Sequence, residues 1–318
     1  MNLLVGALTM GLLLSLLSLG VLITYRVLRT LDLTAEGAFG VGAAVSMALL
    51  ARDLSPVTTI IGAAVAAGLA GAVAGLLTVR VRLAVPLAGM LTSTALYSVA
   101  LFVMGGGDLP AGLRPTFFAL VATIPSALGL AADSAPLGVS VAGWISLVTL
   151  MVLVLLVTIA FRAFLASDVG LALRATGDNS IMARAQGVNT DRMLLIGLAL
   201  ANMLIGLSGA LLAHYEGFAN VQMGIGALAT GLAGVLVGEV LFAPRRVGAV
   251  IGSVIAGTLL FRIVVAGALR VGLNPNALKL VTAVLVLSML ALRGVLGVAL
   301  GAKRAAPAGV PEIEIDRE

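Results

Sequence analysis

Few residues of this chain could carry out chemistry, and their types point away from catalysis. The chain has one histidine, His214, and no cysteine, which excludes a His-rich or thiolate metal site and a cysteine nucleophile. A nucleotide-binding P-loop needs a lysine directly after a glycine. The two lysines, Lys279 and Lys303, follow leucine and alanine instead. We therefore expect no catalytic residue, metal site or cofactor in this chain, and any ATP-driven work must use another subunit.

One group of polar residues with functional potential is the run Leu31–Gly37. Asp32 or Thr34 can cap a helix that starts here, and Glu36 would lie in its first turn. The following stretch, Gly37–Leu50, has only 14 uncharged residues, or about 21 Å of helix, which is too short to cross a bilayer. The simplest interpretation is a broken helix that starts partway into a membrane, with both carboxylates facing a cavity or the inner interface. The alternative is an interfacial loop with two solvated carboxylates.

The other group is Ser167–Met193, a polar segment of 27 residues with three arginines, three aspartates and three glycines. Asp178 or Asn179 can cap a short helix over Ser180–Gln186, and Gly187 suits the left-handed residue that ends it.

The next membrane helix would then be capped by Asn189 or Thr190 and begin around Asp191. Ile181, Met182 and Ala185 lie toward one side of the short helix and Arg184 toward another. A short capped amphipathic helix between two membrane spans fits a groove on a partner, whereas the alternative is an ordinary ordered loop.

The rest of the chain is too apolar for a soluble domain. Hydrophobic residues make up 61% and charged residues 10% of it, and the mean hydropathy is +1.19, whereas soluble domains carry about 25% charged residues. Each of six uncharged runs exceeds the roughly 18–20 residues that cross a bilayer: Met1–Tyr25, Leu54–Val79, Leu83–Gly107, Ser134–Phe161, Met193–Ala213 and Gly217–Gly238. We predict an all-α polytopic integral membrane protein with about nine transmembrane segments (8–10). Residues 1–301 would form the membrane domain and 302–318 a disordered cytoplasmic tail.

The positive charges orient these segments. If Ser167–Met193 is cytoplasmic, fourteen Lys and Arg residues lie in cytoplasmic positions and three, Arg52, Arg114 and Arg270, lie outside, while Arg262 and Lys279 lie near outer helix ends. This distribution satisfies the positive-inside rule and predicts an outer N-terminus and a cytoplasmic C-terminus. The net charge of +5 therefore reflects loop bias and does not indicate nucleic-acid binding.

Two further polar positions have structural interpretations. Glu239 lies a turn or two from Arg245 and Arg246, which favours an ion pair over a proton relay. His214 lies at the outer end of a membrane helix, where we expect an interfacial position with solvated neighbours.

The motifs resemble those of the permease subunits of ATP-binding-cassette (ABC) importers for branched-chain amino acids and ribose. Leu173–Asn179 together with Ala183–Arg192 resembles their coupling segment, and Leu31–Gly37 resembles an element near their N-terminus. The glycine-rich runs Ile205–Ala213, Leu232–Gly238 and Val247–Gly252 follow in the same order. The resemblance covers about residues 10–292 and is closest to a branch linked with aromatic amino acid uptake.

This resemblance implies a permease of the bacterial cytoplasmic (inner) membrane with several partners. These are cytoplasmic ATPase subunits, which bind the ATP and magnesium, an extracytoplasmic substrate-binding protein, a second permease copy and membrane lipid. The implied translocation-path residues are Asp32, Thr34, Glu36 and Gly37. The implied ATPase-coupling residues are Arg174, Thr176, Asp178, Asn179, Met182, Arg184, Gly187, Asn189 and Asp191.

We therefore expect a permease that translocates a small polar solute, with an amino acid as the expected solute, by alternating access driven by separate ATPases. The alternative is a secondary transporter that uses an ion gradient, for which Asp32 and Glu36 are the candidate ion site. A third interpretation is a membrane scaffold without a solute path.

Overall fold

The fold is described from a computed structural model of the chain, which describes residues 2–123, 141–243 and 247–270 together with scattered positions between 280 and 291. The predicted tail, 302–318, lies outside the described residues. The helices are α1 (Asn2–Leu22), the π-helix η1 (Ile23–Val27), α2 (Thr34–Leu50), α3 (Pro56–Arg80), α4 (Val85–Met104), α5 (Phe117–Ala122), α7 (Val141–Ala166), α8 (Asp168–Asp178), α9 (Ser180–Ala185), α10 (Thr190–Glu216), the 3-10 helix η3 (Val221–Gly224), α11 (Ala227–Phe242) and α12 (Val247–Arg270). Two short strands, β1 (Asp108–Pro110) and β2 (Phe218–Asn220), complete the described elements.

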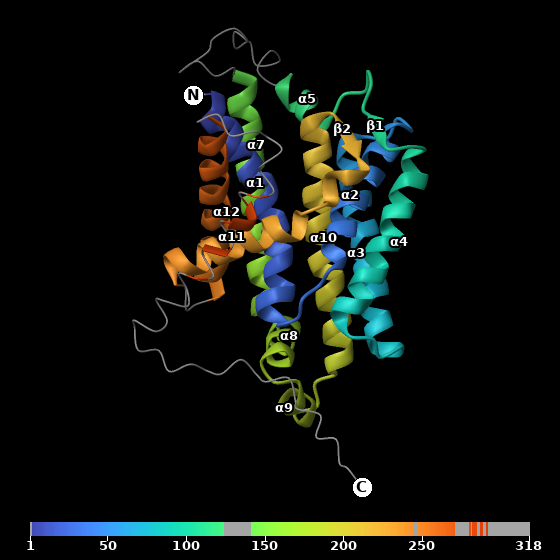
Figure 1. The fold of residues 1–318 in the computed structure, drawn as a ribbon, viewed down its shortest axis with the longest axis vertical. Helices are drawn as coiled ribbons and strands as arrows, with labels where there is room; N and C mark the ends of the chain where they lie inside the picture. The colour runs from blue at the N-terminus through green and yellow to red at the C-terminus, as the bar shows by residue number, and fades with distance from the viewer. Residues whose placement is uncertain are drawn as a thin grey trace.

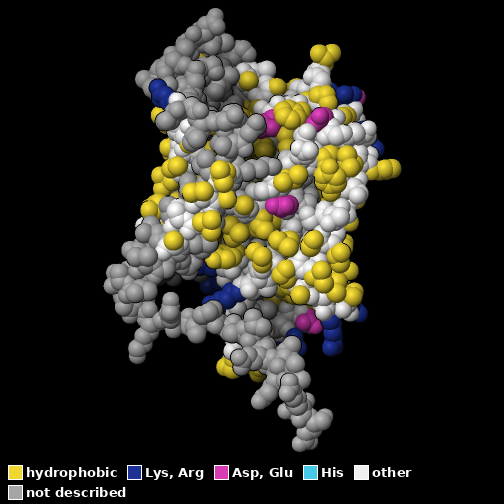
Figure 2. Space-filling view, viewed as in Figure 1, with side chains coloured by type: hydrophobic (Ala, Val, Ile, Leu, Met, Phe, Trp, Pro, Cys, Tyr) yellow, Lys and Arg dark blue, Asp and Glu magenta, His cyan; other side chains and the backbone are white. Residues whose placement is uncertain are grey.

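Within the described residues, seven helices are long and apolar enough to cross a membrane, and α2 is a shorter apolar helix. This confirms the predicted all-α polytopic membrane protein. The stretch after Arg270, which the count of about nine segments includes, lies mostly outside the described residues. On the face drawn in Figure 2, hydrophobic side chains cover the middle and most Lys and Arg side chains lie toward the two ends.

The bundle is built around α1 and α10. Helix α10 packs against α3, α2 and α1, and α1 also packs against α12, α11 and α7, so α2, α3 and α4 lie on one side of the molecule and α7, α11 and α12 on the other (Figure 1). Leucines of α1, including Leu13, Leu16 and Leu17, are fully buried. Close packing of α2 on α10 requires glycine, because a Cβ on Gly42 would collide with the backbone of Gly206.

Helices α8 and α9 project from one end of the bundle, whereas α5, β1 and β2 lie at the opposite end (Figure 1). We call these ends the α8–α9 face and the β1–β2 face. The strands pair antiparallel with Leu109 opposite Ala219, which joins the segment after α4 to the segment after α10.

The β1–β2 face is fastened by polar contacts between loops and helices. Arg114 donates to the Asp53 carboxylate over 2.7 Å, and this guanidinium lowers the pKa of the exposed Asp53 side chain. Nearby, the short helix α5 is capped by Thr116, whose side chain accepts from the Ala119 N–H.

The expectation of an interfacial, solvated His214 is wrong. The side chain is 1% exposed and bridges two elements. Its Nδ1 accepts from the Phe117 backbone N–H over 3.2 Å, and its Nε2 lies 3.0 Å from the Thr59 hydroxyl. Because the Thr59 hydroxyl donates to the Pro56 carbonyl, the geometry fits a neutral imidazole with its proton on Nε2. His214 thus fastens α5 and α3 to the end of α10.

Candidate functional site

The polar segment Ser167–Met193 forms two helices rather than the single short helix expected from the sequence. Ser167 caps α8 by accepting from the Gly170 N–H. Asn179 caps α9, because its Oδ1 accepts from the N–H groups of Ile181 and Met182 over 3.1 and 3.0 Å. Of the two predicted caps of the short helix, Asn179 is confirmed. Asp178 instead ends α8.

The end of α9 and the start of α10 are fixed as predicted. Gly187 has a φ of 86°, in the left-handed region that suits glycine. Asn189 caps α10 by accepting from the Arg192 N–H over 3.0 Å. Both helix starts are thus fixed by local caps that satisfy backbone N–H groups.

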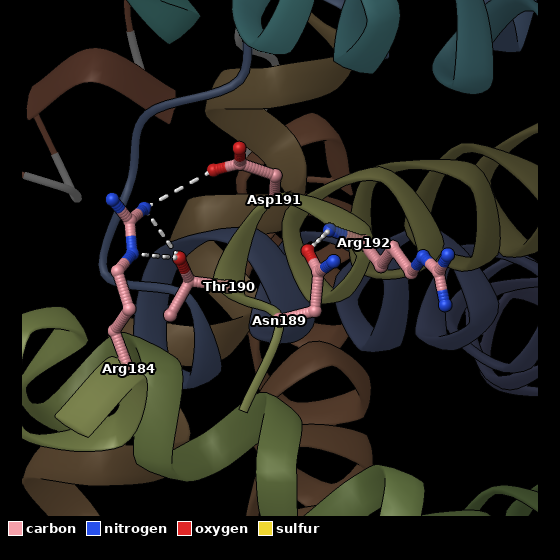
Figure 3. Close-up of polar contacts among 5 residues, drawn as sticks. All are labelled: Arg184, Asn189, Thr190, Asp191 and Arg192. Atoms are coloured by element: carbon pink, nitrogen blue, oxygen red, sulfur yellow. Dashed lines mark hydrogen bonds and ion pairs between the residues drawn. The ribbon is translucent and has the colours of Figure 1, made fainter. Parts of the chain in front are cut away.

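Arg184 adds a side-chain bridge across this turn (Figure 3). Its guanidinium donates to the Thr190 hydroxyl over 2.7 Å and to the Asp191 carboxylate over 3.2 Å. The outward surface of α9 is apolar, since Ile181 is 81% and Met182 58% exposed. The structure therefore brings together a fixed short helix and an exposed apolar contact surface at the tip of the α8–α9 face.

Helix α8 connects this tip to the membrane bundle. Asp178 pairs with Arg29 over 2.6 Å, and a Cβ on Gly177 would collide with the Val27 carbonyl oxygen at the end of η1. Leu173 is fully buried and lies against Gly197 of α10. Helix α8 is therefore in direct contact with the end of η1 and with α10.

Two predicted coupling residues, Arg174 and Thr176, lie within α8 rather than in α9. The Thr176 hydroxyl donates to the Ala172 carbonyl within α8, and Arg174 lies on the wall of a cavity of about 920 Å³. This cavity is also lined by Arg26, Arg29 and Glu239. Arg26 and Glu239 form an ion pair that joins η1 to α11.

Among the described residues Glu239 pairs with Arg26, whereas the partners predicted from the sequence are Arg245 and Arg246. Those two arginines lie outside the described residues. Sequence reasoning treated Arg26 and Arg29 only as orienting charges, because their partners are far away in the chain.

We predict that Glu239→Ala weakens the bundle and that reversing both charges restores it. The Glu239 side chain is 8% exposed, so its loss leaves a partly buried Arg26 without this carboxylate and costs about 2–4 kcal/mol. The double variant Arg26→Glu with Glu239→Arg should recover at least half of the loss. Thermal unfolding of the purified protein measures both, and equal losses in the single and double variants would contradict a direct pair.

The predicted path residues fall into two pairs. Asp32 and Thr34 are buried, at 1% and 0% exposure, and they shape the turn before α2. One Asp32 oxygen accepts from the Thr34 N–H and the other from the Asn202 amide, both over 2.8 Å. The N-cap position of α2 is Leu33, without a side-chain cap, so neither Asp32 nor Thr34 is the predicted N-cap, although Asp32 accepts from the first N–H of the helix. Asn202 escaped sequence reasoning, although a lone amide inside an apolar helix is itself a signal.

Glu36 and Gly37 line an open cavity of about 260 Å³. The opposite walls come from α4 and η3, with Ser93, Thr94 and Tyr97 as the polar members from α4. Helix α2, with 17 residues, spans about 26 Å at 1.5 Å per residue. The predicted short helix is confirmed, and it begins at Thr34.

The fold and site define a multi-pass membrane protein with a capped helical projection at one end and a carboxylate-lined cavity in the bundle. Comparison with known sequences gives the family. The family model described as "Branched-chain amino acid transport system / permease component" matches residues 3–292. The chain therefore belongs to this permease family, as the motifs predicted, and it is a transport component.

Individual relatives agree with this assignment. The chain is 30% identical to a tyrosine transport system permease protein of Clostridioides difficile, with 90% of each chain covered. It is 28% identical to an uncharacterized protein of Rickettsia prowazekii, over 88% of this chain and 94% of that one. A shorter match, 31% identical, covers 41% of this chain and 36% of the autoinducer 2 import system permease protein LsrC of Escherichia coli. No solved structure matches the chain.

Proposed function

We propose that this chain is the membrane permease subunit of an ATP-driven importer that translocates an amino acid by alternating access. The capped helix α9, with Ile181 and Met182 exposed, is the observation that carries the proposal. Membership of a permease family supports it, and the tyrosine transport permease of C. difficile makes an aromatic amino acid the first solute to test.

In this proposal the α8–α9 face is cytoplasmic and α9 inserts into a cleft on a separate ATPase subunit, which binds ATP and magnesium. The β1–β2 face, with the N-terminus, receives solute from an extracytoplasmic binding protein. ATP-driven closure of the ATPases moves α9, and α8 passes the movement to η1 and α10. The ATPases supply the energy, because a conformational cycle needs a ligand that binds its states differently.

The solute path runs past Glu36 and Gly37, with Asp32 and Thr34 holding the turn that shapes it. A second copy of the chain would cover part of α4, which leaves Leu87, Met90 and Phe102 exposed. The cytoplasmic membrane of a bacterium is the expected location.

The test is solute uptake by the chain purified together with the proteins that accompany it from a mild detergent. We expect an ATPase and a binding protein to co-purify, and vesicles that contain this complex to accumulate L-tyrosine or another amino acid only with ATP. Accumulation driven by a proton or sodium gradient without ATP would overturn the proposal in favour of a secondary transporter. If no solute accumulates and no partner co-purifies, the result would favour a membrane scaffold.

A further inference from the structure

Within the part of the chain that the structure describes, the Glu36 carboxylate accepts one hydrogen bond, and the other residues that line its cavity are uncharged. Its Oε1 accepts from the Gly226 backbone N–H over 3.0 Å, at the start of α11. Among the residues that the structure describes, no Lys or Arg forms an ion pair with it. A carboxylate in a membrane domain is costly without a cation or water, so this site suits a positively charged ligand.

The cavity surrounding Glu36 has the chemistry of a site for a small organic cation. Tyr97 of α4 is 44% exposed and can present its ring face to an ammonium group. The hydroxyl of Ser93 offers an acceptor, while Leu96 and Ile225 supply apolar walls. A volume of about 260 Å³ lies just below the usual range for drug-sized ligands and suits a solute of amino acid size.

The position of Glu36 is fixed by the fold rather than by its own side chain. Its backbone is pressed against η3, because a Cβ on Gly224 would collide with the Glu36 carbonyl oxygen. The Gly226 N–H then holds one carboxylate oxygen, and Gly226 itself has a φ of 87°. The starts of α2 and α11 thus meet at this carboxylate, so a solute held here would contact two helices that alternating access could separate.

We propose that Glu36 binds the ammonium group of the transported solute, with Tyr97 beside it, and so selects primary amines. This inference rests on the proposed transport function and names the chemical group that its path recognises. In this inference, the neutral walls of the cavity contact the side chain of the solute.

The absence of cysteine from the chain allows a direct measurement of the charge that the cavity presents. Ser93→Cys places a thiol on the cavity wall, and Gly106→Cys places one in an exposed loop as a matched control. Each variant, in the complete complex in vesicles, is treated with a cationic aminoethyl or an anionic sulfonatoethyl methanethiosulfonate. For each variant, the labelling rate with the cationic reagent is divided by the rate with the anionic reagent. This ratio should be about tenfold larger for the Ser93→Cys variant than for the Gly106→Cys control, because opposite charges attract strongly at short range.

Adding Glu36→Gln should bring this ratio close to that of the control, whereas Glu36→Asp should preserve most of the difference. Glutamine keeps the acceptor for the Gly226 N–H, so the fold should be retained. A ratio equal to that of the control with Glu36 present, or a ratio that Glu36→Gln does not change, would overturn the inference.

Protection from labelling provides a readout that leaves Glu36 intact. Millimolar tyramine should slow modification of the Ser93→Cys variant several-fold, whereas 4-hydroxyphenylpropionate, which lacks the amine, should not. Equal protection by both compounds would also overturn the inference. ATP-driven uptake by the unmodified complex is measured alongside, because uptake without charge selectivity refutes only the ammonium site, whereas absent uptake refutes the transport function.

Discussion

Replacing Met182 with Asp and Arg184 with Glu together should abolish ATP-driven uptake. Met182 supplies part of the apolar surface of α9, and Arg184 holds α9 to Thr190 and Asp191 at the start of α10. A charge on the contact surface opposes insertion into a partner, and the reversed charge would lie beside Asp191. We expect uptake to fall by at least about 100-fold, which corresponds to roughly 3 kcal/mol of lost coupling.

The loss should be accompanied by loss of the co-purifying ATPase, while the yield and thermal stability of the membrane domain change little. Leu113→Asp is the matched control, since Leu113 is a fully exposed apolar residue in the loop after β1, away from α9. That variant should keep the ATPase bound. If the double variant retains both uptake and ATPase coupling, α9 is not the coupling helix.

Asp32→Ala should destabilise the membrane domain more than any other single carboxylate substitution discussed above. It would leave the Thr34 N–H and one N–H of the Asn202 amide without their acceptor in a site that is 1% exposed, while the Asn202 nitrogen keeps its bond to the Leu198 carbonyl. Unmade buried hydrogen bonds of this kind cost about 1–3 kcal/mol each, and more where a charged group took part. We expect a clear fall in the midpoint of thermal unfolding, followed by loss of uptake.

Asp53→Ala is the control for this effect. Asp53 also forms hydrogen bonds to a side chain, that of Arg114, but it is exposed at the β1–β2 face. Surface ion pairs contribute little to stability, so this variant should unfold close to the parent temperature. An equal fall in unfolding temperature for both variants would mean that burial does not explain how much Asp32 contributes to stability.

Helix α4 packs closely against the turn that contains Asp32. A Cβ on Gly89 of α4 would lie 2.8 Å from the Leu33 N and 3.0 Å from an Asp32 oxygen. The backbone of α4 therefore packs directly on the turn, and the carboxylate is confined by position as well as by hydrogen bonds.

Much of the polar segment could be predicted because its determinants lie within a few residues of one another. Asn179, Gly187 and Asn189 each act on backbone groups two or three positions away, or on their own dihedral angles. Helix capping depends on such local geometry, so the short helix and the start of α10 followed from the sequence. Helix α8 was missed, because its glycines and mixed charges resemble a loop.

The contacts that define the cavities could not be predicted in the same way. Asp32 and Asn202 are 170 residues apart, Glu36 and Gly226 are 190 apart, and Arg26 and Glu239 are 213 apart. No local pattern encodes such pairs, since each depends on which faces of the helices pack together.

The sequence by itself determined that this is a polytopic helical membrane protein, that one polar segment carries a capped helix, and that a short apolar helix follows Asp32. Hydropathy, charge and capping are properties of neighbouring residues, and this makes them readable along the chain. Only the tertiary structure decided that Asp32 is buried as a structural group while Glu36 opens into a cavity. The two carboxylates stand four residues apart, but packing of α4 and α10 covers one of them and leaves the other accessible.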